Sequence, residues 1–295
     1  MPSRLGRRRL FHAVSVLALV LGAGLALPMV LASTRGGPVA PATAEVFQEL
    51  VYRAAPGQDN SVTITQTGTT NRTDPPSYVI DDVVPIIARS GCTHPDAADR
   101  TKVSCTVPPE DASMDVPATL VMWLGDGDDT ATVHTGAGIV NGHNEIHLGS
   151  GKDTWTGTAQ EGLLIWGDAG DDTITSSEGG TIDGGPGDDT LYAGNEVLAV
   201  GGPGDDKIHG GAGSQILTGG LGDDVIYGGP GDDVIYGSEG DDVMYGNSGD
   251  DTMWGESKAL TRGEKFGKRR DDKLYGGPGR DTLDGGPGTD TVLQD

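Results

Sequence analysis

Four nine-residue units follow one another without a gap between Gly219 and Trp254, with the sequences GGLGDDVIY, GGPGDDVIY, GSEGDDVMY and GNSGDDTMW. In each unit, a Gly-rich half that ends in Asp precedes a short half whose middle residue is apolar. Because glycine readily adopts positive φ angles, the first half predicts a tight turn, and the β-branched and aromatic residues of the second half predict a short strand. One apolar residue per unit cannot form a core alone, so we expect a solenoid in which stacked units align these residues.

The sixth residue of every unit is an aspartate, so stacking places carboxylates in a file. Bare carboxylates in such a file would repel one another strongly, and we therefore expect cations between them. The donors at hand are hard oxygens from carboxylates and turn carbonyls, with no soft ligand nearby. This donor set favours several Ca²⁺ ions over Zn²⁺ or copper.

These units resemble the RTX, or haemolysin-type, calcium-binding repeats of secreted bacterial proteins, whose nonapeptide reads G-G-x-G-x-D-x-U-x. The resemblance implies an all-β protein built on a parallel β-roll, a β-solenoid in which turn aspartates and backbone carbonyls of neighbouring coils hold rows of Ca²⁺. Further matches to the turn motif begin at residue 124 and continue to the C-terminus. Extended to them, the resemblance implies these metal ligands: Asp129, Asp153, Asp172, Asp189, Asp206, Asp224, Asp233, Asp242, Asp251, Asp272, Asp281 and Asp290.

The spacing of the aspartates predicts how they divide between the two edges of the roll. If each coil uses two units, turns about 18 residues apart share an edge, and the series from Asp172 to Asp242 has spacings of 17 and 18 residues. On the opposite edge, Gln215 stands in the sixth place, and aspartates begin only with Asp233 and Asp251. We expect the early coils to bind Ca²⁺ along one edge, and both edges to be loaded from about residue 219 onward.

The charge of the chain agrees with cationic ligands. The 295 residues include 44 Asp or Glu against 20 Lys or Arg, and residues 167–295 hold 27 acidic and 9 basic residues. Phosphate binding needs the opposite sign, so this balance excludes nucleic acid as a partner. The acidic half is also too charged to collapse by itself, which predicts that its folding depends on bound cations.

The N-terminal residues have the layout of a signal peptide over residues 1–32. Arginines precede an apolar run from about residue 13 to 27, and Val30-Leu31-Ala32 provides a small-residue cleavage site. Arg8 and Arg9 also look like a twin-arginine signal, so the export route stays open between the two types. We expect a secreted, extracellular protein with no membrane association after cleavage, followed by a flexible linker over residues 33–46 that is rich in Pro, Ala, Gly and Thr.

Residues 47–120 are predicted to form a β-rich N-terminal cap that covers the open end of the solenoid. Cys92 and Cys105, the only cysteines, are predicted to form one disulfide there. This block resembles the non-repetitive part that precedes the repeats in some secreted actinobacterial calcium-binding proteins. The β-roll is then predicted over residues 121–295, with an insertion at 255–266 whose basic residues mark either a solvated loop or a site for an anionic polysaccharide or cell-surface component.

Other patterns indicate less about function. His143, Glu145 and His147 lie close together but lack the Glu that directly follows the first His in zincins, and they stand in predicted β-repeat sequence, so exposed coil residues are favoured over a zinc site. The tryptophans at 123, 155, 166 and 254 lie in predicted strands, where packing is favoured over a carbohydrate-stacking platform. No Walker loop, nucleophile elbow or Cys/His nucleophile pair is visible.

The combined interpretation is a secreted calcium-binding protein that is a structural or binding module and not an enzyme. Two alternatives stay open. The first is a calcium-dependent enzyme that acts on polysaccharide, and the second is a surface adhesin or surface-layer component.

Overall fold

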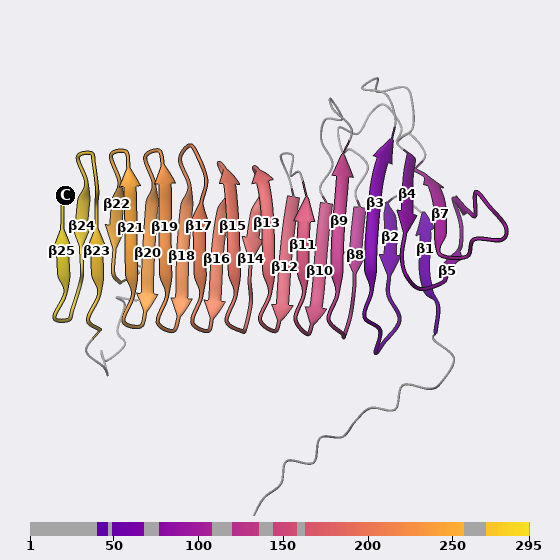
Figure 1. The fold of residues 1–295 in the computed structure, drawn as a ribbon, viewed down its shortest axis with the longest axis horizontal. Helices are drawn as coiled ribbons and strands as arrows, with labels where there is room; N and C mark the ends of the chain where they lie inside the picture. The colour runs from indigo at the N-terminus through magenta and orange to yellow at the C-terminus, as the bar shows by residue number, and fades with distance from the viewer. Residues whose placement is uncertain are drawn as a thin grey trace, which may run out of the picture. The chain divides into compact units, whose positions relative to one another are not determined.

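The computed structural model describes residues 40–46, 49–67, 77–107, 120–135, 144–157, 163–256 and 270–294 (Figure 1). The chain divides into residues 1–38 and a compact unit formed by residues 39–295. The predicted signal peptide and the first part of the predicted linker lie outside the described residues. Every regular element in the described part of the chain is a β-strand, and no helix there could cross a membrane. The all-β prediction is confirmed.

The described strands form two sheets, and from β8 onward the chain alternates strictly between them, so that neighbours within each sheet are parallel. The first sheet has the order β24 (Thr282–Asp284), β22 (Thr252–Trp254), β20 (Val234–Glu239), β18 (Ile216–Leu221), β16 (Leu198–Pro203), β14 (Thr181–Asp183), β12 (Leu163–Ala169), β10 (Asn144–Ser150), β8 (Leu120–Trp123), β2 (Leu50–Arg53), β1 (Ala42–Val46) and β5 (Ile86–Ala88). The second sheet has the order β25 (Thr291–Leu293), β23 (Lys273–Tyr275), β21 (Val243–Ser248), β19 (Val225–Pro230), β17 (Lys207–Gly210), β15 (Thr190–Asn195), β13 (Thr173–Glu178), β11 (Thr154–Gly157), β9 (Thr130–Thr135), β3 (Ser61–Thr67), β4 (Ser77–Asp81), β7 (Lys102–Thr106) and β6 (Cys92–Thr93). This is the predicted parallel β-roll.

The core lies between the two sheets and consists, in the nonapeptide coils, of one apolar residue from each short strand. This is the eighth residue of the unit, because its side chain points inward while the seventh and ninth point outward. Ile226 and Met244 pair in register in the second sheet, Ile235 and Met253 pair in the first, and all four are fully buried. The file of apolar residues expected from the repeat is therefore the core of the roll.

The roll begins earlier in the chain than expected. Strands β2 and β3 pair in parallel with β8 and β9, so residues 50–67 form the first coil, although they were predicted to belong to the cap. The cap proper consists of β1 and β4 to β7. The linker prediction is wrong for its last residues, because Ala42–Val46 forms β1 and pairs with both β2 and β5.

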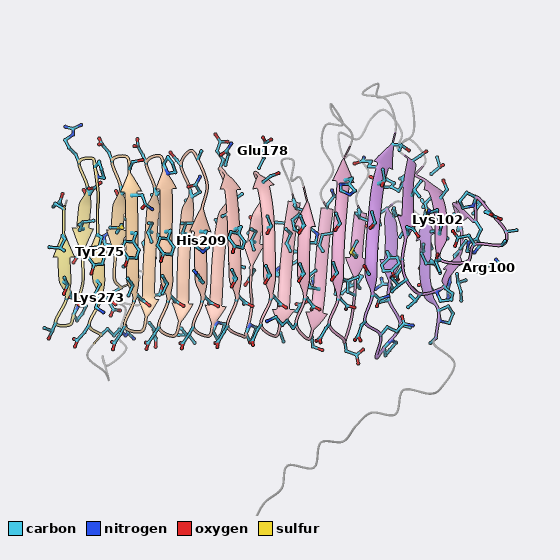
Figure 2. All side chains as sticks on the ribbon, viewed as in Figure 1. Arg100, Lys102, Glu178, His209, Lys273 and Tyr275 are labelled. Atoms are coloured by element: carbon cyan, nitrogen blue, oxygen red, sulfur yellow. A yellow bond between two sulfur atoms is a disulfide. The ribbon has the colours of Figure 1, made fainter. Side chains whose placement is uncertain are left out.

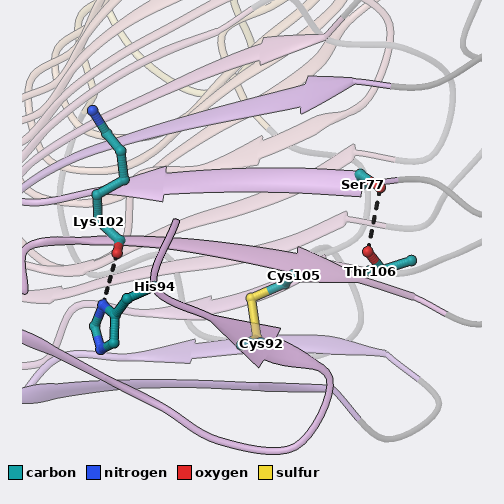
Figure 3. The surroundings of a disulfide bond; sticks show 6 residues. All are labelled: Ser77, Cys92, His94, Lys102, Cys105 and Thr106. Carbon is teal, nitrogen blue, oxygen red and sulfur yellow. Dashed lines mark hydrogen bonds between the residues drawn. A yellow bond between two sulfur atoms is a disulfide. The ribbon is translucent and has the colours of Figure 1, made fainter. Parts of the chain in front are cut away.

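The predicted disulfide joins Cys92 of β6 to Cys105 of β7, which are directly opposite each other in an antiparallel pair (Figure 3). Both cysteines belong to the buried core. Nearby, the ring nitrogen Nδ1 of His94 lies 2.9 Å from the carbonyl oxygen of Lys102, and the hydroxyls of Ser77 and Thr106 lie 3.4 Å apart. The cap is therefore held by a disulfide and by local polar contacts between protein groups.

Asp82 links the cap to the first coil. Its buried carboxylate accepts hydrogen bonds from the Tyr52 hydroxyl, from Asn60 Nδ2 at 2.7 Å and from the backbone N–H of Ser61 at 3.0 Å. Burial, and then the charge of Asp82, raise the pKa of Tyr52, so its hydroxyl stays protonated and donates. Protein donors thus satisfy a buried carboxylate at this end of the roll.

We expect Asp82→Ala to destabilise the cap strongly. The change leaves the Tyr52 hydroxyl and the Asn60 amide buried without their acceptor, which costs roughly 3–5 kcal/mol when a buried charged partner is removed. Chemical denaturation of the chain at saturating calcium measures this loss. As a control, Asp96→Ala removes an exposed carboxylate whose hydrogen bond, from Ala98 N–H, is local, and it should cost well under half as much. Equal losses for the two variants would contradict the role of Asp82.

Candidate metal centre

The turns join the two sheets along two edges of the roll. We call the edge where the chain passes from the first sheet to the second the long edge, and the opposite edge the short edge. The long edge runs along the bottom of Figure 1, where strands such as β18 and β20 end. Glycine is needed in these turns where successive coils approach closely. Gly170, for example, has φ +140° and lies directly against the Gly151 carbonyl of the preceding coil.

A continuous file of carboxylates follows the long edge. In each turn the backbone N–H of the sixth residue donates to Oδ1 of the sixth residue in the next coil, at distances between 2.5 and 3.0 Å. Asn60 heads the file, so the first coil carries an amide where later coils carry a carboxylate. The members of the file are Asn60, Asp129, Asp153, Asp172, Asp189, Asp206, Asp224, Asp242, Asp272 and Asp290.

A second file follows the short edge and is shorter. The N–H of Gln215 donates to Asp233 Oδ1 at 2.8 Å, Asp233 donates in the same way to Asp251 at 2.9 Å, and Asp251 donates to Asp281 at 3.0 Å. The side chains thus divide between the edges as their spacing predicted. Calcium occupancy along each edge stays a prediction.

The second carboxylate oxygen of these aspartates has no hydrogen-bond donor. Oδ2 of every sixth-position aspartate from Asp129 to Asp281 is buried and without a partner among the described residues. A Cβ placed on Gly228, the first residue of its turn, would lie 2.5 Å from Asp233 Oδ2 and 2.8 Å from the Gly246 carbonyl oxygen of the next coil. The glycine therefore leaves open a space that oxygen atoms surround and that no donor fills.

This space suits a hard cation. Buried polar atoms are almost always paired, and a regular series of unpaired carboxylate oxygens facing carbonyl oxygens calls for positive charge. Among the described residues, no three His, Cys, Asp or Glu side chains converge on one point, so an ion would take one or two carboxylates and complete its shell with backbone carbonyls. Ca²⁺ accepts such flexible oxygen shells, and it is the ion these residues fit best.

Burial makes the free carboxylates costly to ionise. Burial raises the pKa of Asp172 and of Asp224 to about 8 and that of Asp242 to about 7, while the backbone hydrogen bond to each lowers it and the neighbouring aspartates raise it further. Unneutralised, the files therefore oppose folding at neutral pH. A bound cation stabilises the charged form and reverses this effect.

Calcium-free protein should become less stable as the pH rises. Since the folded-state pKa of these aspartates lies above the unfolded value, their contribution to stability is present at low pH and is lost as the pH rises toward about 8. Far-UV circular dichroism of protein freed of calcium by resin, between about pH 5 and 8, should show the β-signal decrease. Calcium affinity should rise over the same range, because Ca²⁺ competes with protons for these oxygens. A β-signal that increases with pH without calcium would contradict this.

The first two predicted ligands sit in different surroundings. Leu124 and Leu148 replace glycine at the start of the turns that end in Asp129 and Asp153, and both leucines are fully buried. At the corresponding glycines of later turns, a Cβ would point toward the aspartate Oδ2, so the leucine side chains start in the direction of this space. Asp129 and Asp153 are therefore poorer candidates than the aspartates from Asp172 onward.

The insertion does not interrupt the long-edge file. Residues 257–269, which hold most of the predicted basic patch, lie outside the described residues. Arg270 follows them and forms ion pairs with Glu256 and, at 3.3 Å, with Glu239 of the preceding turn. The Asp242 N–H still reaches Asp272 Oδ1 at 2.9 Å. The contact of Arg270 with Glu256, which the sequence did not predict, holds the two ends of the insertion at the turn.

The histidine and tryptophan patterns have structural roles. The His147 ring lies between the rings of Trp123 and Trp166, with centroids 3.8 and 4.5 Å away, and the Arg53 guanidinium lies over the Trp123 ring. Trp155 is buried. His143 lies outside the described residues, so the predicted preference for coil residues over zinc is not tested there.

A row of rings also crosses the outer face of the second sheet (Figure 2), where His209 and Tyr275 are labelled. The row consists of the rings of Tyr192, His209, Tyr227, Tyr245 and Tyr275. Neighbouring ring centroids are 4.9–5.0 Å apart, and neighbouring ring planes are within 10° of parallel. Because each ring face inside the row covers the next, these rings offer edges to solvent.

The fold and the files define a class: a parallel β-roll whose turns form metal-binding repeats. Comparison with protein families matches the family described as "RTX calcium-binding nonapeptide repeat (4 copies)". The matches cover residues 164–180, 181–196, 199–226, 227–257 and 266–292. This part of the chain therefore carries RTX calcium-binding nonapeptide repeats, and these repeats support a calcium-binding module. Searches of curated proteins and of solved structures give no match.

Proposed function

We propose that this protein is a secreted, non-enzymatic module whose roll folds around rows of Ca²⁺ and then serves as a rigid structural or binding element. The observation that carries the proposal is the series of buried Oδ2 atoms that face carbonyl oxygens without donors. The ligands are the aspartates from Asp172 onward on the long edge and Asp233, Asp251 and Asp281 on the short edge. Asp129 and Asp153 are kept as weaker ligands.

Two features support secretion. Residues 1–32 have the composition of a signal peptide, and the Cys92–Cys105 disulfide suits an oxidising compartment. Extracellular calcium modules often bind with dissociation constants on the order of 10⁻⁴ to 10⁻³ M, which would leave the roll unfolded in a low-calcium cell and fold it outside.

A non-enzymatic role is supported by how the acidic residues are used. The sixth-position carboxylates take part in the files, so they are not free to act as a general acid and base pair. The alternatives, a polysaccharide-acting enzyme and an adhesin or surface-layer component, would need a site away from the files. Arg270, the described residue of the predicted basic patch, is engaged by Glu239 and Glu256.

Three measurements on the exported protein test the proposal. Isothermal calorimetry should show several calcium ions per chain, and calcium should not induce association in light scattering. A screen on acidic polysaccharides, with and without calcium, should show no cleavage. Cleavage would favour the enzyme, calcium-dependent self-association would favour the adhesin, and the absence of calcium binding would refute the proposal.

Asp233→Asn should cost more calcium-dependent stability than Asp172→Asn. Asp233 lies where both edges carry sixth-position aspartates, whereas among the described residues of the short edge no sixth-position aspartate comes before Gln215. Asparagine keeps the Oδ1 acceptor and removes the charge, so the difference reports cation binding. We expect thermal unfolding with and without calcium to show a gap of about 1 kcal/mol, within the range that one partly saturated site contributes. The reverse order would contradict the two-edge arrangement.

A further inference from the structure

Gln215 occupies the sixth place of the turn between β17 and β18, at the head of the short-edge file. It is 2 % exposed, and its backbone N–H donates to Asp233 Oδ1 as a file aspartate would. Its side chain is neutral, so by the repeat pattern this turn lacks a metal ligand. The orientation of the Gln215 amide group indicates that its oxygen atom can nevertheless serve as a metal ligand.

The amide nitrogen of Gln215 is held by two carbonyl oxygens. Nε2 donates to Ala212 O at 3.0 Å and lies 3.4 Å from Gly194 O. These acceptors determine which end of the amide is the nitrogen, because a flipped amide would place its oxygen against two carbonyl oxygens. Oε1 therefore points the other way, where it is buried and has no hydrogen-bond partner within the described part of the chain.

Gln215 Oε1 lies beside the first glycine of its turn, as Asp233 Oδ2 does in the next turn of the same edge. A Cβ placed on Gly210 would collide with the Gly228 carbonyl oxygen and lie 3.0 Å from Gln215 Oε1. The same construction on Gly228 meets the Gly246 carbonyl oxygen at 2.8 Å and Asp233 Oδ2 at 2.5 Å. Both turns thus direct a buried side-chain oxygen and a carbonyl oxygen of the next coil toward one space beside a glycine.

We propose that Gln215 Oε1 and the Gly228 carbonyl oxygen form the first cation site of the short edge, one coil before the aspartates begin. Two acceptor oxygens without a donor between them are stabilised by a cation, and amide and carbonyl oxygens are ordinary Ca²⁺ ligands. The inference rests on the proposed calcium function. Since an amide attracts a cation less than a carboxylate does, this site binds more weakly than the Asp233 site and fills after it.

The test counts calcium ions by native mass spectrometry and measures affinities by calorimetry on the full chain. Gln215→Leu removes the oxygen at similar volume and should lower the count by one. Gln215→Asp restores the usual residue of the repeat, and it should keep the count and tighten the weakest site by roughly tenfold, because ligand charge tunes affinity. The matched control is Asp232→Asn, which changes an exposed residue of the same edge while keeping the Oδ1 acceptor for Asp250 N–H. It should leave the count unchanged.

The outcomes distinguish failure of the Gln215 site from failure of the proposed function. A wild-type chain that binds no calcium refutes the proposed function itself. A wild-type chain that binds several ions, together with a Gln215→Leu variant of unchanged count and affinity, overturns the Gln215 site alone. If Gln215→Leu fails to fold at saturating calcium, the Asp variant decides, because unchanged or weaker binding in it overturns the site and tighter binding supports it.

Discussion

Removal of calcium is expected to unfold the roll over residues 163–256 and 270–294. Without cations, the buried Oδ2 atoms along the two files have neither donors nor counter-charge among the residues that the structure describes. Binding to the folded state alone adds about 2.7 kcal/mol per site at a hundredfold excess over its dissociation constant, and several sites together exceed the 5–15 kcal/mol that is roughly the stability of a whole domain. The β-signal in far-UV circular dichroism should therefore collapse in chelator and return when calcium is added.

Magnesium provides the matched control for this result. Mg²⁺ has the same charge but requires a small octahedral shell and retains its water, so it should restore little of the signal at equal concentration. The cap should retain its protection in hydrogen exchange, because the disulfide and the Asp82 contacts hold it without a cation. A fully ordered spectrum in chelator at about pH 8, where the aspartates are expected to ionise, would refute coupled folding and binding.

Gly170→Ala should destabilise the roll locally even at saturating calcium. The added Cβ would overlap the backbone carbonyl of Gly151, and φ at this residue is +140°, a region that L-residues rarely adopt. Backbone strain and overpacking each cost about 1–3 kcal/mol, so we expect a loss of roughly 4 kcal/mol. Because each coil contacts only its neighbours, hydrogen exchange should show the loss concentrated at coils next to residue 170.

Gly125→Ala is the control that separates the cost of backbone strain from the cost of steric overlap between coils. Gly125 also has a positive φ, +97°, but a Cβ there would meet nothing within 4 Å. This variant should lose only the strain contribution, about 1–3 kcal/mol. Equal losses for the two variants in chemical denaturation would show that close packing of successive coils is not what requires glycine in these turns.

The repeating part of this protein could be predicted from its sequence, because each turn is specified by residues within it. Glycines supply the positive φ angles, an aspartate takes the sixth place, and one apolar residue two places further on takes the inward position. Since these local preferences recur with a nearly constant period, spacing alone assigned Asp172 and Asp233 to opposite edges. The pairing of Cys92 with Cys105 needed no more than their being the only two cysteines.

Features that depend on contacts between distant coils could not be predicted from the sequence and are visible only in the three-dimensional structure. The sequence pattern places residues 50–67 in the cap, because parallel pairing of β3 with β9 joins segments about 70 residues apart and leaves little local signal. The filling of the first two turns by Leu124 and Leu148, and the unpaired oxygen of Gln215, likewise follow from which atoms the next coil brings near. A local pattern specifies a turn, but the space beside it is formed by two coils together, so the differences between individual cation sites could be found only in the stacked structure.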